Sequence, residues 1–240
     1  MSKIRSAAFD LEGTVVDVET AHHQGHILAA RDIGVNITLE ESLKKLPHCI
    51  GGPTEKVAED ICKLAASEYG IIADVNDVLA STRRHYDELL RNTLIMPRHG
   101  FTDFFYAAQN AGLECSIGSL TDEKHALILL ERSGLLKLFN YDHIVLKEHV
   151  KNLKPAPDVW IETAKRTNVA PDEQMVFEDS PRGIQGAIKV GAYCIGMPVY
   201  NKPEPICALA QAGAKRIFMD WQDINPSALL KNVAYEHAKQ

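Results

Sequence analysis

A short apolar segment that ends in carboxylates is the feature that most constrains how this chain can fold. Ala7, Ala8 and Phe9 form an apolar run near the start of the 240-residue sequence, and Asp10 follows them directly. Such a run is typical of a strand buried in a parallel sheet. Residues just beyond the carboxyl end of a strand face the crevice where open α/β sheets bind ligands. We therefore expect Asp10 to lie at a ligand-binding edge of a sheet.

The residues after Asp10 suit such an edge. Alternate residues of an extended segment point the same way, so Asp10 and Glu12 can both face the crevice. Gly13 allows the chain to turn sharply and to approach a ligand closely. Taken alone, the stretch Asp10-Leu11-Glu12-Gly13-Thr14 fits an acidic turn after an edge strand equally well. The rest of the chain has to distinguish these two interpretations.

Residues 17–93 have a helical pattern without a convincing strand. Helices are expected at residues 21–31, from Thr38 onward, at residues 54–69 and at residues 76–92. Thr38 and Glu41 form a capping-box pattern, and Gly34 and Gly70 suit helix ends. We therefore expect residues 17–93 to form an inserted, all-α cap domain.

Beyond Pro97, strand and helix patterns alternate. Strands are expected at residues 113–118, 141–146, 174–177, 193–197 and 216–218. Helices are expected at residues 100–111, 122–133, 157–168, 183–190 and 208–212. This alternation favours a parallel sheet with helices on both faces. We predict an α/β fold with a doubly wound, mainly parallel sheet, formed by residues 1–16 and 94–240 and interrupted by the cap.

Polar side chains follow several of the expected strands, and one more lies in a Lys-Pro-Ala-Pro-Asp loop between them. In chain order the set is Asp10, Glu12, Ser119, Lys154, Glu178 and Asp179. Parallel strands bring such loops to the same carboxyl edge. Carboxylates from two loops, one hydroxyl and one ammonium should therefore surround a single crevice.

This set of groups suits phosphoryl transfer. A carboxylate such as Asp10 can act as nucleophile and form an aspartyl-phosphate. Mg²⁺ held by carboxylates neutralises the anionic ester. Lys154 adds a positive charge, and the Ser119 hydroxyl can donate to a phosphate oxygen. Glu12 is placed to protonate the leaving alkoxide. The residues therefore predict a Mg²⁺-dependent phosphotransferase.

Four motifs in this order resemble the haloacid dehalogenase-like hydrolase superfamily, in its subgroup with a helical cap after the first strand. The motifs are Asp10-Leu11-Glu12-Gly13-Thr14, Ser119, the loop from Lys154 to Asp158, and Glu178-Asp179-Ser180-Pro181-Arg182-Gly183-Ile184. The resemblance covers nearly the whole chain and implies a Rossmann-like core. β-Phosphoglucomutase and phosphoglycolate phosphatase are the members that the pattern resembles.

The resemblance also implies a role for each motif residue. Asp10 is the implied nucleophile and Glu12 the implied general acid. The implied Mg²⁺ ligands are Asp10, Asp179 and the backbone carbonyl of Glu12. The residues expected to bind substrate are Ser119, Leu120 and Lys154. Glu178 is either a further ligand or a residue that supports the ligands.

Glu12 is the one departure from the family pattern, which usually has Asp at this position in phosphatases and mutases. Glu keeps the acid but is one methylene longer, and a misplacement of about 1 Å can cost on the order of a hundredfold in rate. An acid here argues against dehalogenation. We expect a phosphatase of a small phosphorylated metabolite. The alternatives are a phosphomutase of the β-phosphoglucomutase type and a non-catalytic protein that binds a phosphate ligand.

Composition excludes several other classes of function. The net charge of −6 does not suggest a nucleic-acid or anionic-membrane partner. The sequence lacks the run of about eighteen apolar residues that a membrane-spanning helix needs. Five scattered cysteines form neither a disulfide framework nor a metal-ligand pattern. A reducing cytoplasm is therefore the expected location, and no pattern specifies an oligomeric state.

Two features of the expected cap leave alternatives open. The histidines at 22, 23 and 26 could bind a metal, be structural, or present His22 or His23 to substrate. The stretch Gly51-Gly52-Pro53 is either a plain turn between helices or a loop that dips toward substrate.

Overall fold

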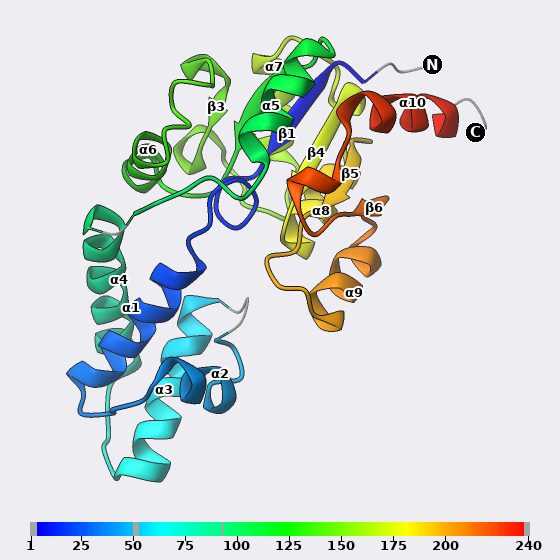
Figure 1. The fold of residues 1–240 in the computed structure, drawn as a ribbon. Coiled ribbons are helices and arrows are strands. Elements are labelled where there is room, and N and C mark those ends of the chain that lie inside the picture. The colour runs from blue at the N-terminus through cyan, green and yellow to red at the C-terminus, as the bar shows by residue number, and fades with distance from the viewer. Residues whose placement is uncertain (1–3, 50–52, 93, 238–240) are drawn as a thin grey trace. The chain divides into compact units, whose positions relative to one another are not determined.

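The computed structural model describes residues 4–49, 53–92 and 94–237. The chain divides into two compact units (Figure 1). Residues Met1–Asp17 and Ile95–Gln240 form one of them, which we call the α/β unit. Residues Val18–Leu94 form the other, which we call the helical unit. Within the described ranges, no helix has both the length and the apolar character needed to cross a membrane.

The described part of the α/β unit contains a six-stranded sheet in the order β3-β2-β1-β4-β5-β6 (Figure 1). The strands are β1 Ser6–Phe9, β2 Glu114–Gly118, β3 Ile144–Val145, β4 Gln174–Glu178, β5 Tyr193–Gly196 and β6 Arg216–Ile217. Each neighbouring pair is parallel. Because β1 lies between β2 and β4, the loops after these three strands leave the same edge side by side. The predicted α/β fold is confirmed.

Helices cover both faces of this sheet. Their bounds are α5 Phe101–Asn110, α6 Glu123–Arg132, α7 Asp158–Arg166, α8 Pro181–Ile188, α9 Pro203–Ala212 and α10 Pro226–His237. Short 3-10 helices are η1 Tyr141–His143, η2 Lys147–His149, η3 Pro171–Glu173 and η4 Trp221–Asp223. Side chains alternate between the faces of a strand, so each central strand contributes to both layers.

Ala8 of β1 and Val176 of β4 belong to one layer of the core. They pack in a buried cluster with Trp160 of α7, Ile184 of α8 and Leu209 of α9. Small side chains on the strands leave room for these larger helical ones. Helices α7, α8 and α9 are therefore held against this face by apolar burial.

The next residue of each strand, Phe9 and Phe177, belongs to an aromatic layer on the opposite face. Their ring centroids are 5.2 Å apart. Phe9 is also 5.3 Å from Phe101 of α5 and 5.7 Å from Trp221 of η4, in edge-to-face geometry. Such ring pairs add to the stabilisation that comes from apolar burial alone. This layer fixes the end of β1, from which Asp10 emerges.

Three elements of the α/β unit differ from the sequence-based expectations. The strand expected at 141–146 is reduced to η1 and the two residues of β3, because Asn140 accepts a hydrogen bond from the Asp142 amide and starts a turn. Helix α9 begins earlier than expected, with Pro203 in its first turn. Helix α10 was not expected.

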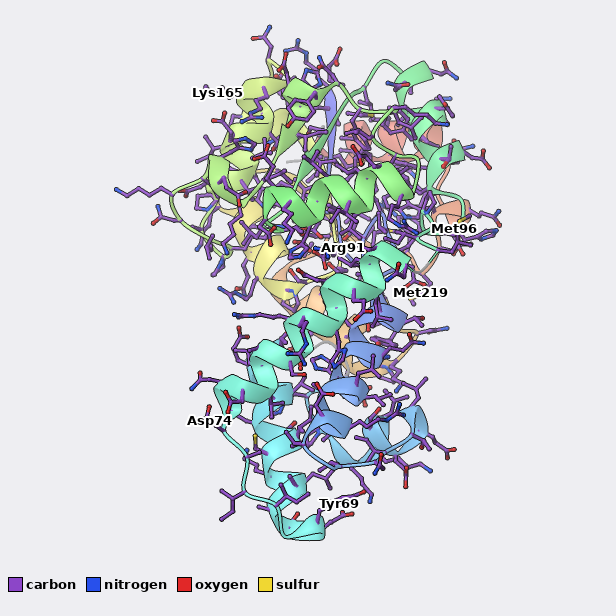
Figure 2. The ribbon with its side chains drawn as sticks, turned by 90° about the vertical axis from the view of Figure 1, so that its left-hand side faces the viewer. Tyr69, Asp74, Arg91, Met96, Lys165 and Met219 are labelled. Carbon is purple, nitrogen blue, oxygen red and sulfur yellow. The ribbon has the colours of Figure 1, made fainter. Side chains whose placement is uncertain are left out.

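The helical unit consists, as far as it is described, of α1 Glu19–Asp32, α2 Leu39–Lys45, α3 Thr54–Tyr69 and α4 Val75–Asn92. Its core includes Ala29, Leu46, Ile61 and Val78, one from each helix or its end. The capping box predicted at Thr38 is present, and Gly70 ends α3 in the left-handed conformation. Tyr69 and Asp74 mark the end of this unit where α3 stops and α4 starts (Figure 2).

Candidate active site

One pocket at the carboxyl edge of the sheet brings the predicted site residues together. Its volume is about 380 Å³. The predicted residues that line it are Asp10, Glu12, Ser119, Leu120, Lys154 and Asp179. They come from the loops after β1, β2 and β4 and from the segment that precedes α7. The convergence expected from parallel strands is therefore present in the α/β unit.

The Lys154 ammonium joins two carboxylates in the buried floor of this pocket. Its Nζ lies 2.5 Å from Asp10 Oδ1 and 2.7 Å from Glu178 Oε1, and it donates to the Gly118 carbonyl at 3.1 Å. Burial lowers the pKa of Lys154, but the two carboxylates outweigh this effect and raise the pKa above its usual value. Lys154 therefore remains protonated.

Three carboxylates face one another beside Lys154. Oxygens of Asp10, Glu178 and Asp179 all lie within 4.8 Å of one another. Burial raises the pKa of Asp10 to about 7, and the Glu178 charge adds to this while Lys154 opposes it. Burial, Glu178 and Asp10 also raise the pKa of Asp179. A hard divalent cation would relieve this repulsion, and carboxylate oxygens are the ligands it prefers. This donor set therefore fits a divalent metal ion.

The motif glycines allow these carboxylates to approach the backbone closely. Gly13 has a φ of +76°, and a Cβ there would collide with the Asp179 carboxylate. A Cβ at Gly183 would collide with the Glu178 carboxylate. Glu178 also accepts from the Ser180 amide at 2.8 Å. Both glycines are therefore required by packing at the site, in addition to any turn they allow.

Hydroxyl groups connect the Glu12 side of the pocket to β2. The Thr121 hydroxyl donates to Glu12 Oε1 at 2.6 Å. Ser119 Oγ lies 3.0 Å from Thr121 Oγ1, and the Thr121 amide donates to Ser119 Oγ at 3.3 Å. The sequence motifs did not identify Thr121. Its place two residues after Ser119, a spacing at which a serine hydroxyl can bond a backbone amide, was the available signal.

Arg98 is a second residue that sequence patterns did not identify. Its guanidinium donates to the carbonyl oxygens of Gly13, Met197, Pro198 and Met219, at distances between 2.7 and 3.2 Å. Burial lowers the pKa of Arg98. These bonds tie the loop after β1 to the segments after β5 and β6. Figure 2 labels Met219, the most distant of these partners in sequence.

Three further contacts hold the loops around the pocket in place. Arg182 of α8 donates to the Lys154 carbonyl, and Trp221 Nε1 donates to the Thr14 carbonyl at 3.1 Å. Thr14 in turn donates from its hydroxyl to Asp179 Oδ1 at 3.3 Å. The loops after β1 and β4 are therefore linked through side chains as well as through strand pairing.

The histidines of the helical unit have other surroundings. His22 stacks on Tyr86 with ring centroids 4.1 Å apart, and His23 Nε2 lies 3.1 Å from the Cys49 carbonyl oxygen. Burial, together with the other two histidines, lowers the pKa of His26 to about 4. Among the described residues, the carboxylates of Asp10, Glu178 and Asp179 lie close enough together to hold a metal ion, and these histidines do not form such a group. Of the Gly51-Gly52-Pro53 stretch, the two glycines lie outside the described residues.

Comparison with known proteins identifies the family. A sequence model of the haloacid dehalogenase-like hydrolases matches residues 7–197. The chain belongs to this family. The predicted membership is thus confirmed, and the match covers the motif loops of this hydrolase from Asp10 to Gly183.

Relatives of this haloacid dehalogenase-like hydrolase include named phosphatases. It is 28% identical to the fructose-1-phosphate phosphatase of Escherichia coli, over 76% of its own chain and 90% of the relative. It is 25% identical to a phosphorylated carbohydrates phosphatase of Thermotoga maritima, over 88% and 92% of the two chains. A haloacid dehalogenase-like protein from Agrobacterium tumefaciens has a similar structure, with a TM-score of 0.75, 25% identity and coverage of 96% and 99%.

Proposed function

We propose that this hydrolase is a Mg²⁺-dependent phosphatase that acts on a small phosphorylated metabolite through an aspartyl-phosphate at Asp10. The observation that carries the proposal is the Lys154 ammonium, held between Asp10 and Glu178 at 2.5 and 2.7 Å beside Asp179. Sugar phosphates are the first candidate substrates, since two relatives are named for phosphorylated carbohydrates.

The residues have complementary roles in the proposed reaction. A carboxylate oxygen of Asp10 attacks phosphorus while the bond from phosphorus to the ester oxygen breaks, and Glu12 protonates the departing alkoxide. Water then attacks the aspartyl-phosphate, Glu12 accepts its proton, and Asp10 and inorganic phosphate are released. Ser119 and the Leu120 amide bind phosphate oxygens, and Lys154 offsets the repulsion between Asp10 and the ester.

The proposed metal ion has a separate task. Asp10, Asp179 and the Glu12 carbonyl would hold Mg²⁺, which when bound neutralises negative charge on the phosphate. Glu178 binds Lys154 and the Ser180 amide, so its role in this proposal is to keep Lys154 in place. Residues 17–93 serve as a cap that sets substrate selectivity, as lids do. The free cysteines support a cytoplasmic location.

Phosphate release from a panel of sugar phosphates and from p-nitrophenyl phosphate tests the proposal. We expect turnover with Mg²⁺, loss of turnover in excess chelator and recovery when Mg²⁺ is restored. Full activity in excess chelator would contradict the metal requirement. Isomerisation of a sugar phosphate without phosphate release, followed by phosphorus NMR, would instead indicate the mutase alternative. Failure to turn over any ester would favour a non-catalytic phosphate-binding protein.

A further inference from the structure

The carboxylate of Glu12 is anchored to the loop that carries the expected phosphate-binding hydroxyl. Thr121 Oγ1 donates to Glu12 Oε1 at 2.6 Å and lies 3.0 Å from Ser119 Oγ. All three residues line the same pocket. The contact joins the loop after β1 to the loop after β2, between residues 109 positions apart in the sequence.

The backbone around Thr121 is well fixed, so its hydroxyl is presented in a defined place. Its amide donates to Ser119 Oγ at 3.3 Å, and its carbonyl accepts from the Lys147 amide at 3.4 Å. Asp122 then caps α6 by accepting from the His125 amide at 3.1 Å. A β-branched side chain such as threonine has few rotamers about its first torsion. The hydroxyl of Thr121 therefore has little freedom to move away from Glu12.

The direction of these hydrogen bonds follows from the groups involved. Glu12 Oε1 accepts whether the carboxyl group is ionised or carries its proton on Oε2, so the single hydroxyl proton of Thr121 goes to Glu12. Ser119 is then the donor to Thr121, and the chain runs from Ser119 through Thr121 to Glu12. If Ser119 donates its hydrogen bond to a phosphate oxygen instead, the hydrogen bond between Thr121 and Glu12 remains intact. Glu12 can thus stay anchored while a substrate binds.

Glu12 needs such an anchor more than an aspartate would. Its side chain has one additional rotatable bond, and ordering it costs more conformational entropy. The extra methylene also allows the carboxylate to reach Thr121 from the loop after β1. We propose that Thr121 is a positioning residue for Glu12, which holds this longer acid at a fixed place relative to the phosphate bound at Ser119. This inference rests on the proposed phosphatase function.

The positioning role of Thr121 is tested with four chains: the parent, Thr121→Val, Glu12→Asp and the double variant. For each chain, kcat and KM are measured on fructose 1-phosphate and on p-nitrophenyl phosphate. In the parent background we expect Thr121→Val to lower kcat for fructose 1-phosphate about tenfold with little change in KM. The effect on p-nitrophenyl phosphate should be smaller, since its leaving group needs little protonation. With Asp at position 12, Thr121→Val should change kcat less than about twofold, because the shorter carboxylate does not reach the hydroxyl.

Two further variants separate positioning from other roles. Thr121→Ser keeps the donor and should restore most of the lost kcat. Thr102→Val removes a threonine hydroxyl from α5, outside the pocket, and should act like the parent. An equal loss from Thr121→Val in both backgrounds, or a loss confined to KM, would overturn the inference, because Thr121 would then contact the substrate directly.

Urea unfolding of the same four chains tests the contact without any turnover. We expect the folding equilibrium constant to show a coupling of about fivefold between positions 12 and 121. Additive effects would overturn the inference. If the parent hydrolysed neither ester while this coupling was present, the proposed function would fail and the anchored Glu12 would stand as a structural contact.

Discussion

The two sides of the pocket are built from different interactions. On the side of β4, Lys154, Asp10 and Glu178 form a buried ionic group in which Lys154 is 6% and Glu178 1% exposed. On the side of β2, Glu12 and Thr121 are partly exposed and are joined through a hydroxyl. The β4 side therefore holds charged groups that are shielded from solvent, and the β2 side holds a carboxyl group that solvent can reach.

This difference predicts how each side responds to substitution. Removal of one partner from a buried ion pair leaves an uncompensated charge and is strongly unfavourable. Loss of a hydrogen bond at a partly exposed site costs far less, because water can take the place of the missing group. Substitutions that remove a charge from the ionic side should therefore lower the free energy of unfolding more than substitutions on the hydroxyl side.

The largest effect is expected from Asp10→Asn. An amide is not a competent nucleophile, so turnover should be abolished while the fold, followed by circular dichroism, is kept. The substitution preserves the shape of the side chain, and Lys154 retains Glu178 as a partner. Initial rates of phosphate release measure the effect. Retained activity above about one per cent of the parent rate would show that Asp10 is not the nucleophile.

Lys154→Ala should come next and should separate the two sides most clearly. We expect turnover to fall at least about a hundredfold, as for the loss of one preorganised electrostatic donor. The free energy of unfolding should also fall, by about 3–5 kcal/mol, since Asp10 and Glu178 lose their buried counter-ion. Rates are therefore compared per folded molecule at a temperature where both chains are folded.

The exposed Lys151 provides the matched control for this variant. Lys151→Ala removes the same charge from a nearby position and should change neither turnover nor stability by much. Lys154→Arg keeps the charge but has a longer, planar head group, so it should not restore activity fully. If Lys151→Ala proved the damaging change, the assignment of Lys154 as the lysine of this motif would be wrong.

Arg98→Ala should have a smaller effect, because Arg98 acts through the backbone. It removes the donor for the carbonyls of Gly13 and Met219, and the loop next to Asp179 loses support. We expect the Mg²⁺ concentration for half-maximal activity to rise about tenfold. This is the lower end of the loss in metal affinity that follows replacement of residues that hold metal ligands in place. Arg31→Ala, at an exposed position of α1, is the control. An unchanged Mg²⁺ requirement would show that Arg98 only stabilises the fold.

The convergence of Asp10, Ser119 and Asp179 could be predicted from the sequence because it depends on strand order and direction alone. Parallel strands place their carboxyl ends at one edge whatever the side chains between them. The bonds of Arg98 could not be predicted, since they join residues 85 to 121 positions apart. Such bonds depend on loop paths that no local pattern encodes.

Local sequence patterns were also insufficient to predict two elements of the fold. Among the described side chains of helix α10, few are buried and apolar, such as Leu229 and Val233, so its periodicity is weak in the sequence. The edge strand β3 pairs only with β2 among the described strands, through Ile144 and Val145. A strand with one neighbour has fewer hydrogen bonds to stabilise its ends. Residues 141–143 therefore form the turn that starts at Asn140 instead of extending the strand.

The smallest effect is expected from Glu12→Asp, on the hydroxyl side of the pocket. The shorter acid gives up the bond to Thr121 but has fewer rotamers to order and corresponds to the family's usual residue. These two changes oppose each other, so kcat on a sugar phosphate should be preserved or raised. Glu12→Gln keeps the length and loses the proton, and should lower kcat by at least about a hundredfold for such an ester. If Gln and Glu at position 12 gave equal rates with this poor leaving group, Glu12 would not be the acid, and the two sides of the pocket would differ in burial without differing in chemical role.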